Sequence, residues 1–540
     1  MPIQPTYPGV YIEEVPSGVR TIIGVATSIT AFIGRAKKGP VEEPVTINNF
    51  GDYERQFGGL WVESTMSYAV QDFYLNGGAQ AIIIRIENGA ETVEIALPVA
   101  SPPDFLVTLQ AGSPGSWANV LRASVDYQTQ DPTALPGSPP PGFLQAQTTF
   151  NLIVYEWNEE LKRDDKVEEY LGVSMDPNAV RYLPRVLEQR SGRIKVKKND
   201  LGNWPSGIPL PTPVDSKLQP VPVRPVSEAR DGVNLEAHNY AGSPNLQTGI
   251  YALKKTDLFN ILCIPPPTRG ADTDSSVYFQ ALELCVKSRA MLLVDPPAEW
   301  GANIDQAVLK PIQKLASLRI SGPFARNAAL YYPLVIKKDP LRENQLDTFV
   351  PCGIIAGIMA FTDTSRGVWK SPAGLDAAMN GVEGLQVNLS DPENGQLNQL
   401  GINCLRSFGF SGLVVWGART MRGANQLADE YKYIAVRRTA LFIEETLYRS
   451  TKWVVFEPND KPLWSQIRLN IGAFMHNLFR QGAFQGSTPR EAYLVKCDEE
   501  TTTQNDVDQG IVNIIVGFAP LKPAEFVIIK IQQLAGQIET

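Results

Sequence analysis

The sequence is short of the residues on which most enzymes and metal sites depend. It has two histidines in 540 residues, His238 and His476, so one chain cannot supply a His-rich metal site, and a Ser-His-Asp triad would need one of these two. The five cysteines show no C-x-x-C spacing, which indicates reduced thiols and synthesis in the cytosol. The common nucleotide-binding, metalloprotease and hydrolase motifs are absent. We therefore expect no catalytic residue, no metal ion and no cofactor.

Membrane and nucleic-acid signals are also missing. The longest uncharged apolar stretch, near residues 352–360, is far shorter than the roughly 20 residues of a membrane helix. The first residues lack the basic start and apolar run of a secretory signal. The net charge is −8, which is typical of neither a nucleic-acid binder nor a protein of anionic membranes. We expect no nucleic-acid partner, no direct membrane insertion, and exit from a cell only by lysis or within a particle.

The order of apolar segments predicts a multidomain, mixed α/β protein. Short apolar strands at 259–264 and 290–295 flank a helical pattern at 275–289, and this alternation favours a largely parallel sheet. A further continuous apolar strand is predicted at 81–86. Other helices are expected at 61–75, 176–189, 305–318, 424–450 and 465–481, and other strands at 21–34, 148–157, 328–334, 493–497, 511–518 and 523–533.

Composition divides the chain into a body, an inserted lobe and two arms. Residues 131–142 hold five prolines and residues 201–225 hold seven, which predicts irregular or polyproline segments. We place them in a β-rich lobe inserted into the body. The expected units are an arm at 1–20, a body at 21–94 and 241–400, the lobe at 95–240, a carboxyl-terminal domain at 401–520 and an arm at 521–540.

Both ends of the chain carry strand-forming residues. A strand that is apolar on both faces belongs inside a sheet, because a free apolar edge promotes aggregation. The two ends either pair with their own body or add strands to neighbouring subunits, and the residues alone leave both open. Hinges are expected at 16–18 and 519–523. The candidate arm residues are Val10, Tyr11, Ile12, Phe526, Val527, Ile528, Ile529 and Ile531.

Four charged residues on the predicted 424–450 helix form two pairs, each of an arginine and a glutamate seven residues further on. Arg437 and Glu444 fall on nearly the same face, and so do Arg438 and Glu445. The simpler interpretation, which the residues by themselves favour, is a solvated face with weak ion pairs. The alternative is a charged surface that contacts a partner.

Two acidic segments were weighed as sites. Asp295 ends a predicted strand, and in open α/β sheets that edge often holds a site, so an α/β enzyme that uses Asp295 is one alternative function. A strand-ending Asp that binds its own loop backbone is the simpler interpretation. The 272–283 segment weakly resembles a calcium loop, but Val277 stands where Gly is needed, and a helix cap at Asp274 or Ser275 is favoured.

Several segments together carry a family resemblance that extends over nearly the whole chain except the 95–240 lobe. The chain resembles contractile tail sheath proteins, which build the outer sleeve of contractile phage tails and of related bacterial injection particles. The segments are Tyr7-Pro8-Gly9-Val10-Tyr11, Phe32-Ile33-Gly34-Arg35-Ala36, Asp295-Pro296-Pro297, Val415-Trp416-Gly417-Ala418-Arg419-Thr420, Phe456-Glu457-Pro458-Asn459-Asp460 and Pro523-Ala524-Glu525-Phe526-Val527-Ile528.

The resemblance implies a structural subunit without enzymatic activity. It implies helical self-assembly around an inner tube, arms that link neighbours, an outward lobe at 95–240, and contraction from a metastable extended state. The expected partners are copies of itself, the tube protein, and the baseplate and tail-terminator proteins. Assembly is expected in the bacterial cytoplasm, within a phage or a phage-tail-like particle. Given the resemblance, the interpretation of the 424–450 helix as a charged, partner-facing surface is favoured over the solvated one, and this helix becomes the candidate tube contact. Another phage-like structural role, such as a tube or capsid protein, stays open.

Overall fold

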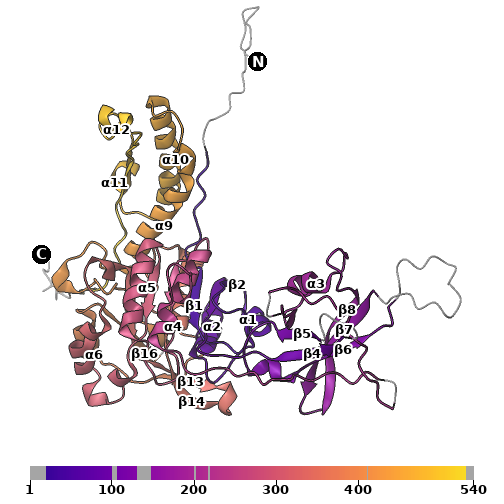
Figure 1. The fold of residues 1–540 in the computed structure, drawn as a ribbon. Helices are drawn as coiled ribbons and strands as arrows, with labels where there is room; N and C mark the ends of the chain where they lie inside the picture. Colours follow the sequence, from indigo (N-terminus) through magenta and orange to yellow (C-terminus); the bar gives the residue numbers. More distant parts are fainter. Residues whose placement is uncertain are drawn as a thin grey trace, which may run out of the picture.

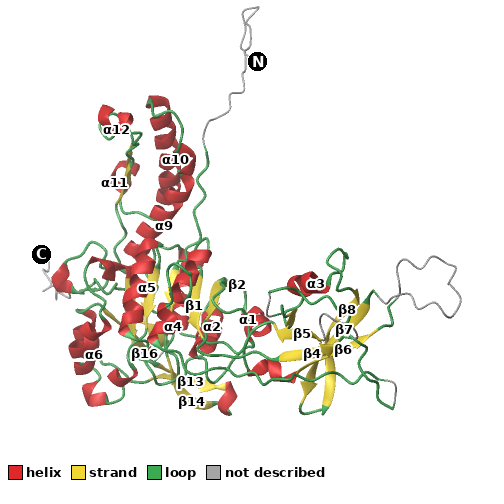
Figure 2. Cartoon of the chain, viewed as in Figure 1, coloured by secondary structure: helices red, strands yellow, loops and turns green. Residues whose placement is uncertain are grey.

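A computed structural model describes residues 20–99, 106–129, 148–199, 202–216, 219–409 and 411–530. Three parts can be followed in Figure 1: a central α/β body, a lobe beside it, and a helical projection that carries α10 and α12. Secondary structure is separated between them, since the lobe consists mostly of strands and the projection mostly of helices (Figure 2). The predicted mixed, multidomain α/β class is confirmed.

An eight-stranded sheet forms the centre of the body. Neighbouring strands from β16 to β3 run parallel, and the edge strands β17 and β2 are antiparallel. The strands in spatial order are β17 (Gly412–Val415), β16 (Ile402–Phe408), β12 (Ala328–Tyr332), β11 (Met291–Val294), β10 (Ile261–Cys263), β1 (Thr30–Gly34), β3 (Ala81–Arg85) and β2 (Val45–Ile47).

Helices cover both faces of this sheet, so the body has two hydrophobic cores. Alternate residues of each strand point to opposite faces: Ile33 packs into one core with α5, and Phe32 packs into the other with α2 and α7. The body helices are α1 (Phe50–Phe57), α2 (Thr65–Leu75), α4 (Ala237–Ala241), α5 (Ser275–Lys287), α6 (Leu309–Lys314), α7 (Cys352–Arg366) and α8 (Asp391–Asn398).

The lobe has a hydrophobic core of its own, formed by residues between 93 and 229. Its described residues form two three-stranded antiparallel sheets and one α-helix. These elements are β4 (Glu94–Pro98), β5 (Leu106–Ala111), β9 (Ile194–Val196), β6 (Leu121–Asp126), β7 (Phe150–Asn158), β8 (Arg163–Val173) and α3 (Leu183–Arg190). A third small sheet belongs to the body and contains β13 (Val335–Asp339), β14 (Gln345–Phe349) and β15 (Gly384–Leu385).

The carboxyl-terminal region has a separate small core in which α10 packs against a two-stranded ribbon. Within α9, Phe442 and Ile443 pack into this core, whereas Ile434 and Leu441 still belong to the body core. β16 and β17 also belong to the body sheet, so the structural boundary lies well after the expected residue 401. The elements are α9 (Ile434–Ser450), α10 (Lys461–Arg480), α11 (Pro489–Ala492), β18 (Tyr493–Lys496), α12 (Gln504–Asp508) and β19 (Ile515–Phe518).

Three expected elements differ from the structure. The helix predicted from 424 begins only at Ile434, because Asp429 pairs with Arg326 and Arg422 and holds the preceding residues in a loop. The helix predicted at 305–318 is broken into short pieces around Pro311. Residues 523–530, the described part of the predicted terminal strand, form no strand. No helix in the described ranges is both long and apolar enough to cross a membrane.

Helix α7 was not predicted, although it is central to the body. It packs against α2 through Gly353 and Gly357, and a Cβ at these positions would lie 2.1 Å from the Ala69 carbonyl oxygen and 2.5 Å from that of Phe73. The two helices therefore approach closely only because both positions lack a side chain.

We expect Gly353→Ala to destabilise the protein by about 2–3 kcal/mol, because the added methyl group forces α2 and α7 apart. Gly472→Ala in α10 is the matched control, since a Cβ there meets nothing within 4 Å. That control should be neutral or stabilising by up to about 1 kcal/mol. Urea unfolding of both variants measures the difference, and equal stabilities would contradict the packing argument.

Candidate interaction surfaces and the carboxyl-terminal anchor

Two of the four charges predicted to face a tube are buried inside the chain. Arg438 is 4% exposed, and its guanidinium donates to both carboxylate oxygens of Asp363 at 2.8 and 2.6 Å. Glu445 is 6% exposed and pairs with Arg289 at 2.8 Å and Arg449 at 2.6 Å. The assignment of Arg438 and Glu445 to a tube-facing surface was wrong, because their charges join α9 to the body.

The other two predicted charges pair with each other. Arg437 Nη1 lies 3.1 Å from Glu444 Oε1, and Arg437 Nε also donates to Asn327 Oδ1 at 3.1 Å. The Glu444 side chain is 42% exposed and that of Arg437 only 13%. Of the four residues, Glu444 therefore presents its charge most openly to solvent.

Arg438→Ala should lower the free energy of unfolding by about 3–5 kcal/mol, because it leaves Asp363 buried without its cation. Glu444→Ala removes an oppositely charged residue of the same helix and should change stability by less than about 1 kcal/mol, because the Glu444 side chain is 42% exposed. Urea unfolding followed by circular dichroism compares the two. A similar small loss in both variants would mean that Arg438 does not hold α9 to the body.

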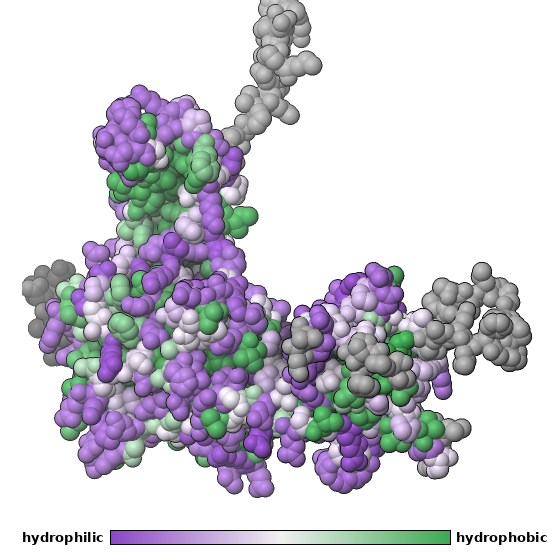
Figure 3. All heavy atoms as spheres, in the orientation of Figure 1, coloured by the Kyte–Doolittle hydropathy of each residue, from purple (hydrophilic) through white to green (hydrophobic). Residues whose placement is uncertain are grey.

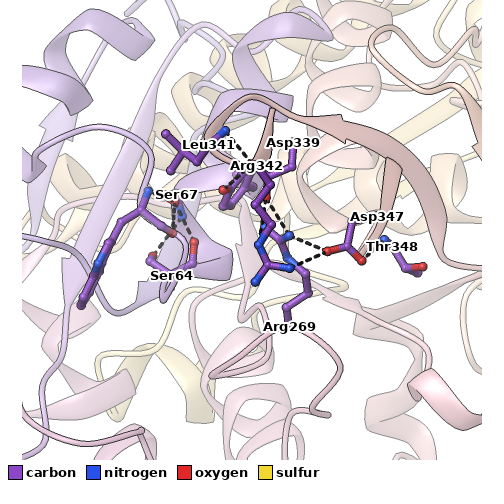
Figure 4. Close-up of polar contacts among 10 residues, drawn as sticks. Ser64, Ser67, Arg269, Asp339, Leu341, Arg342, Asp347 and Thr348 are labelled. Atoms are coloured by element: carbon purple, nitrogen blue, oxygen red, sulfur yellow. Dashed lines mark hydrogen bonds and ion pairs between the residues drawn. The ribbon is translucent and has the colours of Figure 1, made fainter. Parts of the chain in front are cut away.

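A cavity of about 420 Å³ lies at the carboxyl ends of β10 and β11, where an α/β enzyme would hold its substrate. The β13–β14 hairpin and the start of α2 border it, and Figure 4 shows its polar side chains turned toward one another. Arg269 Nη1 donates to Asp339 at 2.7 Å and to Asp347 at 2.6 Å, and Arg342 also pairs with Asp347. Tyr68 donates to Asp339 at 2.9 Å.

These contacts tie the hairpin to the body. Arg269 follows β10, whereas Asp339 and Asp347 lie on the two strands of the hairpin. A second buried pair, Lys337 with Asp72 of α2, joins the same hairpin to the helix beneath it. The charges of this cavity are therefore neutralised by each other within the described structure, and their arrangement is that of a structural clamp.

Asp295 lies beside this cavity and is used as a helix-capping residue. Its Oδ1 accepts a hydrogen bond from the Cys352 amide at 3.0 Å, at the first residue of α7. Burial raises the pKa of the Asp295 carboxyl to about 7, although the bonds from Cys352 oppose this rise. Among the described residues Oδ2 has no hydrogen-bond partner.

Asp274 likewise caps a helix, as predicted, since it accepts from the Ser276 amide at the start of α5.

The raised pKa of Asp295 gives a pH-dependent stability with a defined sign. The folded protein binds this proton more tightly than the unfolded chain, so stability falls as pH rises from about 4 towards 7. Asp295→Asn keeps an acceptor for the Cys352 amide but cannot ionise. We expect this variant to gain stability relative to the parent between pH 4 and pH 8 in urea unfolding, and a difference that is constant across pH would contradict the assignment.

The carboxyl-terminal segment is held on the body by Glu525. Its two carboxylate oxygens accept from Nε and Nη2 of Arg419, both at 2.6 Å, and Tyr433 donates to it at 3.1 Å. The following side chains from Phe526 to Ile529 are 72–81% exposed. Four consecutive large apolar residues thus stand in solvent next to an anchored residue, and none of them pairs with the described body. Val10, Tyr11, Ile12 and Ile531 lie outside the described residues.

The β18–β19 ribbon in the projection is an open sheet. In the described part of the chain β18 pairs with β19 alone, and Leu494 and Ile515 are 46% and 50% exposed. Hydrophobic side chains gather on this projection in the view of Figure 3. Residue 20, where the described chain begins, also lies here, because its amide donates to Asn470 of α10 at 3.0 Å.

Arg419 and Glu525 both stand in the segments that carry the resemblance, but the sequence alone does not connect them. They are far apart in the chain, and nothing in periodicity or spacing pairs them. The available signal was a single arginine in an otherwise uncharged Trp416–Thr420 segment and a single acid before an apolar run.

Comparison with known proteins agrees with this architecture. Residues 319–421 match the phage tail sheath protein central domain, and residues 428–533 match the phage tail sheath C-terminal domain. The tail sheath protein of Vibrio phage KVP40 is 30% identical over 186 residues, and that of Burkholderia phage BcepMu is 27% identical over 273 residues. These matches span 34% and 47% of this chain, and only 26% and 54% of the two relatives.

The fold is shared over the whole chain with solved sheath proteins. The sheath of the extracellular contractile injection system PVC, in its contracted state, matches with a TM-score of 0.56 at 20% identity and covers 99% of both chains. The sheath tail protein Lin1278 of Listeria innocua matches with a TM-score of 0.57 at 12% identity, covering 93% of this chain and 96% of the other. The fold is thus that of these solved sheath proteins. The carboxyl-terminal half of the chain matches tail sheath domains, in agreement with the resemblance found in the sequence.

Proposed function

We propose that this chain is the structural subunit of a contractile tail sheath. It polymerises helically around an inner tube and contracts from a metastable extended state, which drives the tube through a target envelope. The observation that carries the proposal is the apolar segment from Phe526 to Ile529, which is exposed although its residue types belong inside a sheet. The matches of residues 319–421 and 428–533 to two tail sheath domains support the same function.

The β18–β19 ribbon is the acceptor in this proposal. A two-stranded ribbon is only marginally stable by itself, whereas three or more strands on a helix form a stable layer. Its open edges can take an arm from a neighbouring subunit through backbone hydrogen bonds, and the exposed Leu494 and Ile515 can pack against the arm's side chains. Arms exchanged in this way link the subunits into a continuous mesh.

Contraction in this proposal uses no chemical step. The free energy comes from the difference in buried interface between the extended and the contracted lattice. Each Å² of newly buried apolar surface contributes about 25 cal/mol, so roughly 300 Å² per subunit gives about 7 kcal/mol before opposing terms. The body can move as a rigid unit because α9 and the β13–β14 hairpin are tied to it by buried ion pairs.

The proposed partners follow from this role. They are copies of the chain, an inner tube protein, and baseplate and tail-terminator proteins, met during assembly in the bacterial cytoplasm of a phage or phage-tail-like particle. Arg437 and Glu444 stay our candidates for a tube-facing pair, because Glu444 is the exposed charge of α9 described above. The 95–240 lobe, which projects sideways from the body, is proposed to face outward.

Replacing Phe526 and Ile528 together by serine should abolish assembly, because the arm loses one apolar face while the body is unchanged. Val180→Ser is the matched control: Val180 is 93% exposed on the lobe, and its loss should leave assembly intact. Negative-stain electron microscopy should show striated cylinders for the parent and the control, and monomers in sedimentation for the double variant. Normal cylinders from the double variant would refute strand exchange by the arm.

A further inference from the structure

The anchor of the carboxyl-terminal arm is built around a fully buried arginine. Arg419 is 0% exposed, and its Nη1 donates to the Asn398 carbonyl oxygen at 2.7 Å and to Asn425 Oδ1 at 3.0 Å. Its Nε and Nη2 are left for the two oxygens of Glu525, which is a bidentate, charge-assisted pair. The body therefore fixes the guanidinium, and Glu525 of the arm supplies the carboxylate that it binds among the described residues.

The environment of Glu525 favours its ionised form. Burial opposes ionisation, but the hydrogen bonds and the charge of Arg419, with smaller contributions from Tyr433 and Lys432, hold the pKa of Glu525 below its usual range. The Glu525 side chain is 18% exposed, whereas the next residue, Phe526, is 72% exposed. The change from anchored to free thus occurs between two consecutive residues.

The segment before the anchor lies against the body. Residues 521–526 border a groove of about 930 Å³, whose opposite wall includes Trp369, Trp416 and Tyr433. The hinge expected at 519–523 is therefore on the anchored side of Glu525. While the ion pair is closed, the free part of the arm begins at Phe526.

We propose that Arg419 and Glu525 are positioning residues for strand exchange: their ion pair sets the point where the arm leaves its own subunit, and so the register in which Phe526–Ile529 joins the neighbour's sheet. This inference rests on the proposed function. Ala519 and Pro520 are held by backbone pairing to residues 484–492, so opening the ion pair would release residues 521–525 as well, which adds up to roughly 17 Å of reach. A strand advances about 3.3 Å per residue, so this slack spans several registers.

Register matters because both faces of the arm are apolar but differ in shape. Phe526 and Ile528 occupy one face, and Val527 and Ile529 the other. A slip of one residue exchanges the two faces, and apolar alternation alone does not prevent it when neither face is polar. A fixed starting point at Glu525 removes this ambiguity.

Disulfide cross-linking within assembled sheath tests the register. Ile528→Cys is combined in turn with Leu494→Cys, Lys496→Cys and Ile515→Cys on the acceptor ribbon, whose residues are exposed, and covalent oligomers are read on non-reducing gels. With the ion pair intact, one combination should dominate. Adding Glu525→Ala should lower its yield several-fold and raise the others, while Glu188→Ala, the matched loss of an exposed carboxylate on α3 of the lobe, should leave the pattern unchanged.

The outcomes separate the two proposals. An identical pattern with and without Glu525→Ala overturns the positioning role but leaves strand exchange standing. Assembled sheath that gives no cross-link in any combination overturns strand addition to this ribbon. A merely structural ion pair would lower the melting temperature of the variant without redistributing the cross-links.

A second measurement uses the unassembled subunit, so that failure to assemble does not obscure the result. Glu-C protease cleaves after Glu525 only when its carboxylate is free of Arg419. Arg419→Lys keeps the positive charge but loses the bidentate fork. We expect cleavage between Glu525 and Phe526 to be about tenfold or more faster in this variant, and equal rates would overturn the inference.

Discussion

In the proposed assembly, one ion pair between Arg419 and Glu525 sets how this subunit meets its neighbours. It holds an apolar chain end at a defined place on the body, and the residues that follow it, Phe526 to Ile529, have no partner among the described residues. Backbone donors and acceptors of such a segment need another sheet. The open β18–β19 ribbon has the complementary need, since a two-stranded sheet is stabilised by further strands. The proposed strand exchange would satisfy the arm and the ribbon together.

The body supplies the rigidity that such an arrangement requires. Its parallel sheet is covered on both faces by separate hydrophobic cores, and α2 meets α7 at two glycines without intervening side chains. Buried charges join elements that belong to different parts of the sequence: Arg438 joins α9 to α7, and Lys337 joins the β13–β14 hairpin to α2. In the proposed contraction, a subunit joined in this way would transmit displacement to its neighbours through its arms without changing its own packing.

The same buried charges explain where sequence reasoning failed. Helical periodicity correctly aligned Arg437 with Glu444 and Arg438 with Glu445, but it could not tell which face of α9 meets the body. A charged residue is usually exposed, so the solvated or partner-facing interpretations were natural, and the burial of Arg438 depends on Asp363 in a helix that was not predicted. Helix α7 was overlooked because its uniformly apolar start lacks an amphipathic pattern. For Asp295 the simpler structural interpretation was closer, although its partner is the amide of a distant helix and not its own loop.

The sequence by itself determined the α/β class and most strands of the parallel sheet, because these depend on local periodicity and residue type. It also contains an apolar run at the carboxyl-terminal end, and the resemblance to tail sheath proteins could be recognised from short segments spread along the chain. Only the tertiary structure decided which charges are internal, where the arm is anchored and which sheet remains open. These properties depend on side chains brought together from segments hundreds of residues apart, such as Arg419 and Glu525 or Arg20 and Asn470, and local sequence carries no signal for such pairings.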